Sequence, residues 1–553
     1  MSRFGRVRLV RNIGVTLLAF ALVASACGDD DDDDAETGGT DTPSTDTGSP
    51  DTEAESSGDE EPLVIARDMD VNSLDPALAF CDTCQIYMTA VYETLLGLDP
   101  ADNATLVPRL ATEWSSNEDQ TEFTFTLDPA AKFADGTALT SADVKFSWER
   151  LKGLEGSPSF LAASIETIET PDPQTVVVTL TSSNSAFLAA VNAPYFGITN
   201  SALATANGAT TDAATDSAEP WFLENSAGSG PFVLESYAAG NELRLARNDA
   251  YWGTPSEFPS VIFKQTADAV GQRQQLEQGA VDIAMQISAD VAAGISGDDV
   301  VIEQVPSFNF VYLGLSPGAV GGDVLTPEVR EAIGLALDYD GLIDVTVGGA
   351  GRPQPSPIPN GFLGTENLEP RTQDLDRAKQ LMADAGVTEL TLDATYPGLN
   401  VYGVDFSTAM QKVQSDLKEI GINLELNPAE FSVWVDKVIL GDGSPVTMIY
   451  YAPDYTDPSQ YVQYFGLVPE SRWLGLTKLE ESAEQTELLA EAFATQDVDA
   501  RAKLYEQLAE AMMSDEYIFP IVNPDLFLAY RSDISGMHYS ACCNLDLAKL
   551  SRD

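Results

Sequence analysis

Residues 450–461 read YYAPDYTDPSQY, with four tyrosines, two aspartates, two prolines and no basic residue. Two carboxylates this close together could hold a metal ion, form a catalytic acid pair or belong to the wall of a binding site. Asp457 precedes Pro458 and a segment of helical spacing, so we expect Asp457 to be the N-cap of a helix whose first residue is Pro458. Asp454 has no such structural role, and it is therefore the candidate functional residue of the segment.

The cysteines of the folded part offer a second possible chemistry. Cys81, Cys84, Cys542 and Cys543 are an even number, which predicts disulfides in an exported protein. Three pairings are possible. We expect one of the two that join the first two cysteines to the last two, because a bond between adjacent cysteines strains the intervening peptide. A zinc site with four thiolate ligands is the alternative.

Other catalytic and cofactor signatures are missing from the sequence. It contains no G-x-x-x-x-G-K-[ST], no G-x-G-x-x-G after a strand, no H-E-x-x-H and no G-x-S-x-G. The single His538 excludes His-rich metal sites, and no nucleophile signature lies near it, so we expect a packed or surface histidine. We therefore predict a binding protein without a cofactor or metal rather than an enzyme. A surface-anchored glycosidase is the alternative from another class, because carboxylates are abundant.

The first residues predict export. Residues 1–26 contain four arginines, then an apolar run from Ile13 to Val23 and small residues, which is the order of a secretory signal peptide. The following Cys27 resembles the lipidated cysteine of bacterial lipoproteins; an ordinary secreted protein is the alternative. Residues 27–61 hold fifteen carboxylates and neither a basic nor an aromatic residue, so we expect a disordered acidic tether. These features predict an extracytoplasmic protein, lipid-anchored to the outer face of the cytoplasmic membrane.

The charge of the chain limits its partners. Lysine and arginine number 29 against 87 aspartates and glutamates, giving a net charge of −58. Most of this charge remains when the tether is set aside. The surface should therefore repel nucleic acid and anionic lipid, and the ordinary interpretation is a strongly hydrated surface.

Strand and helix patterns alternate from residue 62 onward, which predicts an α/β protein. Residues 121–127 alternate strictly and predict a half-buried strand. Thr140 and Asp143 form a variant capping box ahead of a helix that presents Val144, Trp148 and Leu151 on one face. Further helices are expected at 268–278, 326–337, 374–385, 404–420, 476–494 and 498–514. Residues 197–228, rich in small and polar residues, predict a surface excursion.

Seven further segments stand out in the sequence. They are SLDPALA (73–79), YETLLGLDP (92–100), LVPRLATEW (106–114), TFTLDPAAKFADGTALTSADVKFSWER (124–150), GSGPFVLESYAAGNELRLARNDAYWG (228–253), LEQGAVDIA (276–284) and PEVREAIGLALDYDGLI (327–343). These segments resemble family 5 of the extracellular solute-binding proteins, the peptide- and nickel-binding lipoproteins of ATP-driven (ABC) importers. They occur in the family's order over nearly all of the chain after residue 62, and the cysteines are not part of the common pattern.

The resemblance implies a two-lobed, periplasmic-binding-protein-like α/β clam with a hinge and an extra inserted subdomain. The parts it implies are lobe I from residues 62–92, 226–305 and 526–553, the subdomain from 93–225, and lobe II from 306–525. In this layout the two pairs of cysteines belong to the same lobe.

The resemblance also implies roles for individual residues. Asp454 matches the family's aspartate that pairs with the α-ammonium group of a peptide, with Tyr451 and Tyr455 beside it. By the same matching, Met285 and Gln286 lie near the cleft where the lobes meet. Phe80, after LDPALA, lines the first lobe. Peptide-like ligands would otherwise be held through their main chain as an added strand.

The resemblance thus implies a receptor that captures a short peptide or similar amine-bearing ligand between its lobes and delivers it to a permease and ATPase in the membrane. We expect a monomer. A binder of a metal chelate or another small solute is the alternative within the family, and an adhesion or signalling lipoprotein with the same fold is a third.

Overall fold

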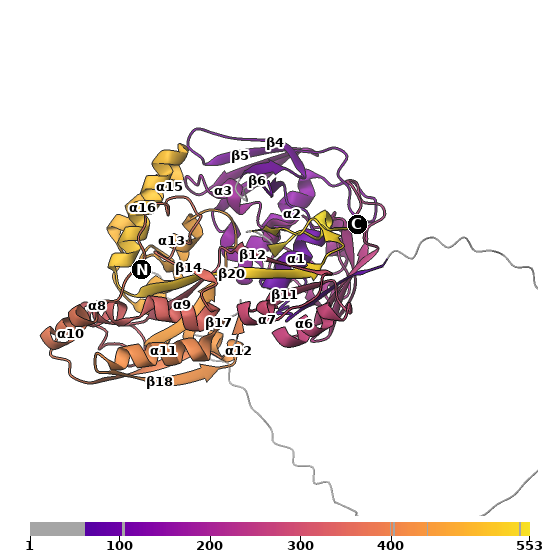
Figure 1. Ribbon diagram of the computed structural model, residues 1–553. Helices are drawn as coiled ribbons and strands as arrows, with labels where there is room; N and C mark the ends of the chain where they lie inside the picture. The colour runs from indigo at the N-terminus through magenta and orange to yellow at the C-terminus, as the bar shows by residue number, and fades with distance from the viewer. Residues whose placement is uncertain (1–60, 102–104, 399, 402–403, 440, 541–543) are drawn as a thin grey trace, which may run out of the picture. The chain divides into compact units, whose positions relative to one another are not determined.

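The computed structural model describes residues 61–101, 105–398, 400–401, 404–439, 441–540 and 544–553 (Figure 1). The predicted signal peptide, Cys27 and nearly all of the acidic tether lie outside the described residues, as do Cys542 and Cys543. Within the described ranges, no helix is both long and apolar enough to cross a lipid bilayer.

Twelve strands form one mixed sheet that a single long strand divides into two parts. The first part of β20 (Ile518–Arg531) pairs with β13 and β14, and its second part pairs with β11 and β12. On one side lie β11 (Ile283–Ile287), β12 (Val300–Pro306), β1 (Leu63–Arg67), β10 (Ser260–Gln265), β9 (Glu242–Arg247) and β8 (Phe232–Ala238). On the other lie β13 (Phe310–Leu315), β14 (Gly351–Pro353), β19 (Val446–Tyr451), β15 (Leu390–Pro397) and β18 (Ile422–Ala429). β20 therefore links two α/β lobes.

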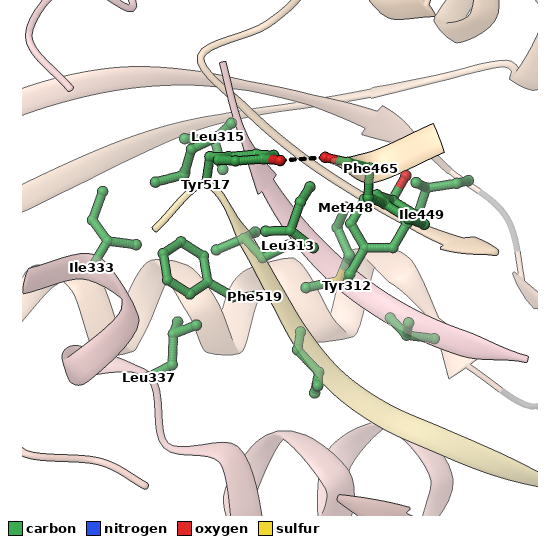
Figure 2. Packing of buried hydrophobic residues seen from close by; sticks show 14 of the residues in the cluster. Tyr312, Leu313, Leu315, Ile333, Leu337, Met448, Ile449, Phe465, Tyr517 and Phe519 are labelled. Carbon is green, nitrogen blue, oxygen red and sulfur yellow. Dashed lines mark hydrogen bonds between the residues drawn. The ribbon is translucent and has the colours of Figure 1, made fainter. Parts of the chain in front are cut away.

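The second lobe packs helices on its part of the sheet around one apolar core. Figure 2 shows Leu313 of β13, Phe519 of β20 and Ile333 of a covering helix packed together there. The hydroxyl of Tyr517 donates a hydrogen bond to the carbonyl of Phe465, which satisfies a buried polar group. The helices are α8 (Pro327–Ala336), α9 (Tyr339–Val347), α10 (Leu375–Asp384), α11 (Phe406–Lys418), α12 (Phe431–Trp434), α13 (Ser459–Phe465), α14 (Arg472–Thr477), α15 (Ala483–Ala494) and α16 (Val498–Ser514).

A separate four-stranded sheet belongs to the segment that precedes β8. Its order is β4 (Ala111–Ser116), β5 (Glu122–Leu127), β7 (Thr175–Leu180) and β6 (Ile165–Asp172), and α2 (Ser141–Gly153) packs against it. The predicted capping box of α2 is confirmed: the N–H of Thr140 donates to Asp143 over 2.9 Å. The face carrying Trp148 is buried, as its spacing predicted.

Shorter elements complete the described chain. The helices are α1 (Asp82–Val91), α3 (Phe187–Ala190), α4 (Ser201–Ala206), α5 (Glu219–Phe222), α6 (Ala269–Glu277) and α7 (Ala289–Ala293). Two-stranded ribbons pair β2 (Leu96–Leu98) with β3 (Leu106–Pro108), β16 (Asn400–Val401) with β17 (Val404–Asp405), β21 (Ile534–Ser535) with β24 (Ser551–Arg552), and β22 (Tyr539–Ser540) with β23 (Asn544–Leu545).

Two predictions about helices and loops need correction. The helix expected at 476–494 is interrupted: α14 ends at Thr477, and α15 begins only at Ala483 with Ser482 as its N-cap. Residues 197–228 are more than a surface excursion, because α4 and α5 enclose a small core of alanines and Phe222. The sequence pattern could not show this, since small residues bury little surface individually and are typical of loops as well as of close helix packing.

A buried ion-pair network ties this small core to the rest of the first lobe. Arg150 of α2 donates to both carboxylate oxygens of Asp75 at 2.5 Å, and its Nε donates to Asp216 at 3.0 Å. Asp75 is fully buried in the LDPAL segment. Two carboxylates compensate the buried guanidinium with bidentate geometry, which is the condition under which such a network is tolerated.

The predicted cysteine pairing is wrong for the two cysteines that the structure describes. Cys81 and Cys84 are bonded to each other, with their Cα atoms 4.9 Å apart. Cys81 is the N-cap of α1, so one helical turn brings the two residues, three positions apart, within disulfide range. The same bond excludes the proposed four-thiolate zinc site, because neither sulfur is a thiolate.

Replacing both Cys81 and Cys84 with serine should lower the free energy of unfolding by about 2 kcal/mol, because the bond closes only a short loop in the unfolded chain. Scanning calorimetry in an oxidising buffer measures the change. Non-reducing peptide mapping is the control, and it should place this bond within one short peptide. A peptide that links Cys81 or Cys84 to the C-terminal cysteines would contradict the observed pairing.

Candidate functional site

Asp454 lies in the loop that joins β19 to α13, and it is buried, with 6% of its surface exposed. Its backbone N–H donates to Oε1 of Gln460 over 2.7 Å, which fixes the loop against the first turn of α13. β19 is an inner strand of the second lobe, paired with β13 along its whole length. The carboxylate is therefore held by a rigid sheet and a helix start rather than by a free loop.

The carboxylate of Asp454 has no cationic partner among the residues that the structure describes. Within the described part of the chain, its one side-chain donor is the hydroxyl of Tyr451, 3.3 Å from Oδ2. Burial raises the pKa of the Asp454 carboxyl from 3.8 to about 7, and the hydrogen bond from Tyr451 opposes this shift only in part. A carboxylate this buried and this poorly compensated is costly for the fold, which is typical of a functional group.

Aromatic side chains surround Asp454. Tyr451 packs against the rings of Tyr461, Tyr464 and Phe465, with centroids 4.6–5.5 Å apart. The pKa of the Tyr195 hydroxyl is raised by burial and then by the charge of Asp454. Tyr195 precedes β8 in the chain, whereas Asp454 belongs to the second lobe, so the charge of Asp454 acts on a residue of the other lobe.

Asp457 has a structural role, as expected, with one correction. α13 begins at Ser459, and Pro458 occupies the N-cap position that was predicted for Asp457. The carboxylate of Asp457 accepts the N–H of Ser459 over 2.9 Å, so it does cap the first turn. It also forms an ion pair with Arg501 and accepts the hydroxyl of Tyr505 over 3.0 Å. The sequence did not indicate these last two partners, which come from α16.

The two aspartates therefore have separate partners and different electrostatic surroundings. Asp457 is neutralised by Arg501, whereas Asp454 is left uncompensated among tyrosines. No group of three or more metal-ligating side chains occurs in the described part of the chain. A buried carboxylate without a counter-charge can accept a charge-assisted hydrogen bond from one cation.

The other predicted site residues lie in two places. Tyr455 is buried, and its hydroxyl lies 3.2 Å from that of Ser459. Although it follows a strand of the second lobe, its ring packs in the apolar core of the first. Phe80 lies against Tyr195, with ring centroids 5.1 Å apart.

Met285 and Gln286 of β11 line a small cavity of about 20 Å³ together with Arg67 and Asp82. The sulfur of Met285 lies 4.0 Å from Nη1 of Arg67. Oε1 of Gln286 accepts the N–H of Asp68 over 2.6 Å. Met285 and Gln286 lie near the C-terminal end of β11, beside the ion pair of Arg67 and Asp82.

Three residues near the predicted site residues were not predicted from the sequence. Tyr195, whose hydroxyl accepts from Gln85 over 3.0 Å, had no signal, because it comes from a segment far from Asp454 in the chain. Arg67 and Asp82 could have been noticed: an arginine that ends an apolar strand and an acid in the first turn of a helix form an ion pair at 3.0 Å, in which the arginine is buried and the aspartate is half-buried.

A family profile and a relative both match most of this chain. The sequence profile described as "Bacterial extracellular solute-binding proteins, family 5 Middle" matches residues 105–471. A probable D,D-dipeptide-binding periplasmic protein, DdpA of Escherichia coli K12, is 28% identical over 483 residues, covering 86% of this chain and 91% of the relative.

Solved structures share the fold. The periplasmic binding protein DppA of Helicobacter pylori, in complex with the peptide STSA, superposes with a TM-score of 0.77 at 21% identity, covering 89% of this chain and 98% of that chain. NikA of Brucella suis, in complex with Fe(III)-EDTA, superposes with a TM-score of 0.74 at 20% identity, covering 89% and 100%. The predicted two-lobed α/β fold is thereby confirmed.

Asp454→Asn should stabilise the ligand-free protein at alkaline pH. The unfolded chain releases this proton near pH 4 and the folded chain near pH 7. The contribution of the group to the free energy of unfolding therefore falls by about 4 kcal/mol as the pH rises across that interval. Asparagine cannot ionise and avoids this loss. Scanning calorimetry of refolded, ligand-free protein should show a higher midpoint for the variant at pH 8 and little difference at pH 4.

Asp457→Asn is the matched control for this measurement. It removes the partner of Arg501, so it should lower the midpoint at pH 8. If Asp454→Asn lowered the midpoint at pH 8 as well, Asp454 would be a stabilising structural residue instead.

Proposed function

Because the chain belongs to family 5 of the bacterial extracellular solute-binding proteins, we propose that it captures a short peptide or similar amine-bearing ligand between its lobes for an ABC importer. The observation that carries this proposal is the buried carboxylate of Asp454, which has no cation in the described protein. A ligand ammonium group would supply the missing charge.

The buried carboxylate of Asp454 would bind a ligand with an amine much more tightly than a ligand without one. In a site shielded from water, a carboxylate and an ammonium group form a short, charge-assisted hydrogen bond. A ligand without the amine would leave the buried carboxylate unpaired, which costs more than losing a contact at the surface. The hydroxyl of Tyr451 would keep one oxygen oriented while the ligand occupies the other side.

Relatives support a peptide as the ligand class. The relative from Escherichia coli is named as a probable D,D-dipeptide-binding protein, and the structure from Helicobacter pylori holds a peptide. The Brucella suis structure holds a metal chelate, which keeps that class as the alternative. No cluster of metal ligands in the described residues favours it, although a chelated metal needs few protein ligands.

We also propose the lobe boundaries implied by the resemblance. The pairing of β20 supports these boundaries. β20 pairs with β13 as far as Val522 and with β12 from Asp525 onward. β12 ends at Pro306, and β13 begins at Phe310. The chain thus passes between the lobes at least twice in neighbouring strands, as a hinge requires.

Membrane attachment belongs to the same proposal. The arginines, apolar run and small residues before Cys27 support export and lipidation, and the acidic residues up to 61 support a tether. A lipid-anchored receptor on the outer face of the cytoplasmic membrane would deliver its ligand to a permease and its ATPase. This arrangement needs no nucleic acid and no second copy of the chain.

N-acetylation of a peptide ligand should abolish or strongly weaken binding to the wild-type protein, because it removes the ammonium charge that Asp454 would pair with. Asp454→Asn should weaken binding of the free-amine peptide by at least about a hundredfold, the loss of a buried charge pair, while leaving the fold intact. Isothermal titration calorimetry with di- and tripeptides measures both effects.

Tyr451→Phe is the control. It keeps the carboxylate and removes one hydrogen bond, so affinity should fall by only about tenfold. Equal affinities of the wild type and Asp454→Asn for a free-amine peptide would remove Asp454 from the binding site.

A further inference from the structure

Two loops of the four-stranded sheet reach the second lobe. One joins β4 to β5, and the other joins β7 to α3. Nε2 of Gln496, between α15 and α16, donates to the carbonyl of Glu118 in the first loop over 3.1 Å. The backbone N–H of Ser185 in the second loop donates to the carbonyl of Phe493 over 2.8 Å, and α15 lies beside α3 in Figure 1. Hydrogen bonds therefore connect the four-stranded sheet to helices of the second lobe.

Ser185 binds carbonyl groups at the end of α15. The last four carbonyls of an α-helix have no partner in the regular pattern of the helix. The N–H of Ser185 donates to the carbonyl of Phe493, and its hydroxyl donates to the carbonyl of Ala492 over 3.1 Å. Both carbonyls belong to the last turn of α15. A serine beside the four-stranded sheet therefore completes the end of a helix in the second lobe, which makes the contact specific.

Arg501 of α16 joins this contact to the loop of Asp454. Nη1 donates to the hydroxyl oxygen of Ser185 over 3.4 Å, while Nη2 forms the ion pair with Asp457. The carbonyl of Asp457 accepts Nε2 of Gln460 over 3.2 Å, and Oε1 of the same amide accepts the N–H of Asp454. An unbroken series of hydrogen-bonded residues therefore runs from Ser185 to the backbone of Asp454.

The guanidinium of Arg501 binds acceptors from two parts of the fold. In the proposed layout, Ser185 belongs to the subdomain inserted in the first lobe, whereas Asp457 belongs to the second lobe. A planar guanidinium presents several N–H groups in a fixed geometry, so both acceptors together set its orientation. Separation of the lobes breaks the contacts of Ser185 and Gln496, and it leaves Arg501 with Asp457 alone.

We propose that Ser185, Gln496 and Arg501 form a clasp between the lobes, in which Arg501 is a positioning residue that connects lobe closure to the loop of Asp454. The inference rests on the proposed capture of a ligand between the lobes, but not on the amine that Asp454 would bind. A contact that stabilises only the closed state slows the escape of a captured ligand and leaves its first encounter with the open state unchanged. The clasp therefore sets how long a ligand stays bound.

Ser185→Ala tests the clasp through the rate of ligand release. The variant loses the hydroxyl that donates to Ala492 and accepts from Arg501, so alanyl-leucine should dissociate about tenfold faster. Its association rate should stay within about twofold of the wild type. Stopped-flow tryptophan fluorescence measures both rates. Thr495→Ala is the matched control: its hydroxyl donates to the carbonyl of Glu491 within α15, so neither rate should change.

A double-mutant cycle tests the role of Arg501. Arg501→Lys keeps a positive charge for Asp457 but loses the planar group that binds both acceptors. Because Ser185→Ala breaks the same connection, the two substitutions together should accelerate release by less than the product of their separate effects. Effects that multiply in folded proteins would remove Arg501 from the clasp. An unchanged dissociation rate in a folded Ser185→Ala protein would overturn the clasp itself.

Hydrogen exchange tests the clasp without any ligand. Gln496→Ala removes the donor to Glu118, so mass spectrometry should show the backbone N–H groups of residues 184–186 exchanging about fivefold faster than in the wild type. Gln380→Ala, whose side-chain amide donates to Asp384 within α10, is the matched control and should change nothing. Unchanged exchange in Gln496→Ala would overturn the clasp.

The two experiments keep the clasp and the proposed function apart. If the wild type does not bind alanyl-leucine while Gln496→Ala accelerates exchange, the proposed peptide capture fails and the clasp survives. If alanyl-leucine binds and N-acetylation abolishes its binding, while Ser185→Ala and Gln496→Ala change neither release nor exchange, the proposed function survives and the clasp fails.

Discussion

The cost of keeping a carboxylate away from water without a cation governs the arrangement around Asp454. Burial raises its pKa to about 7, so the ligand-free protein must either hold a proton or tolerate an unpaired charge. Neighbouring residues hold it in place: Gln460 fixes its backbone, Tyr451 donates to one oxygen, and the ring of Tyr451 packs against Tyr461, Tyr464 and Phe465. A site of this kind gains most from a ligand that brings one positive charge.

The fold supplies the rigidity that such a site needs. β20 runs through both lobes, and β19 and β13, on the second-lobe side of it, place the Asp454 loop. On the first-lobe side, β1 and α1 place Arg67 and Asp82, and the disulfide between Cys81 and Cys84 fixes the first turn of α1. The buried network of Arg150 holds the segment before α1. Each wall of the site is thus connected to a core and not to an exposed loop.

The sequence predicted the periodic parts of the fold well and the long-range contacts poorly. Helices such as α2 and α8 were predictable because capping residues and apolar spacing are local signals. The pairing of Cys81 with Cys84 was missed because a bond between neighbouring cysteines was expected to strain the peptide, whereas the start of α1 brings the two residues within disulfide range. Asp454 was predicted from its motif, but its lack of a cation and the contribution of Tyr195 depend on the approach of distant segments, which no local pattern encodes.

The most direct measurement is the number of protons released when a free-amine peptide binds at pH 6, from calorimetry in buffers of different ionisation enthalpy. The ligand-free protein should hold the proton of Asp454 at this pH, and pairing with an ammonium group should expel it. We predict the release of about one proton per ligand by the wild type and none by Asp454→Asn. Peptide binding without proton release by the wild type would contradict the role of Asp454 as the buried partner of the ligand's amine.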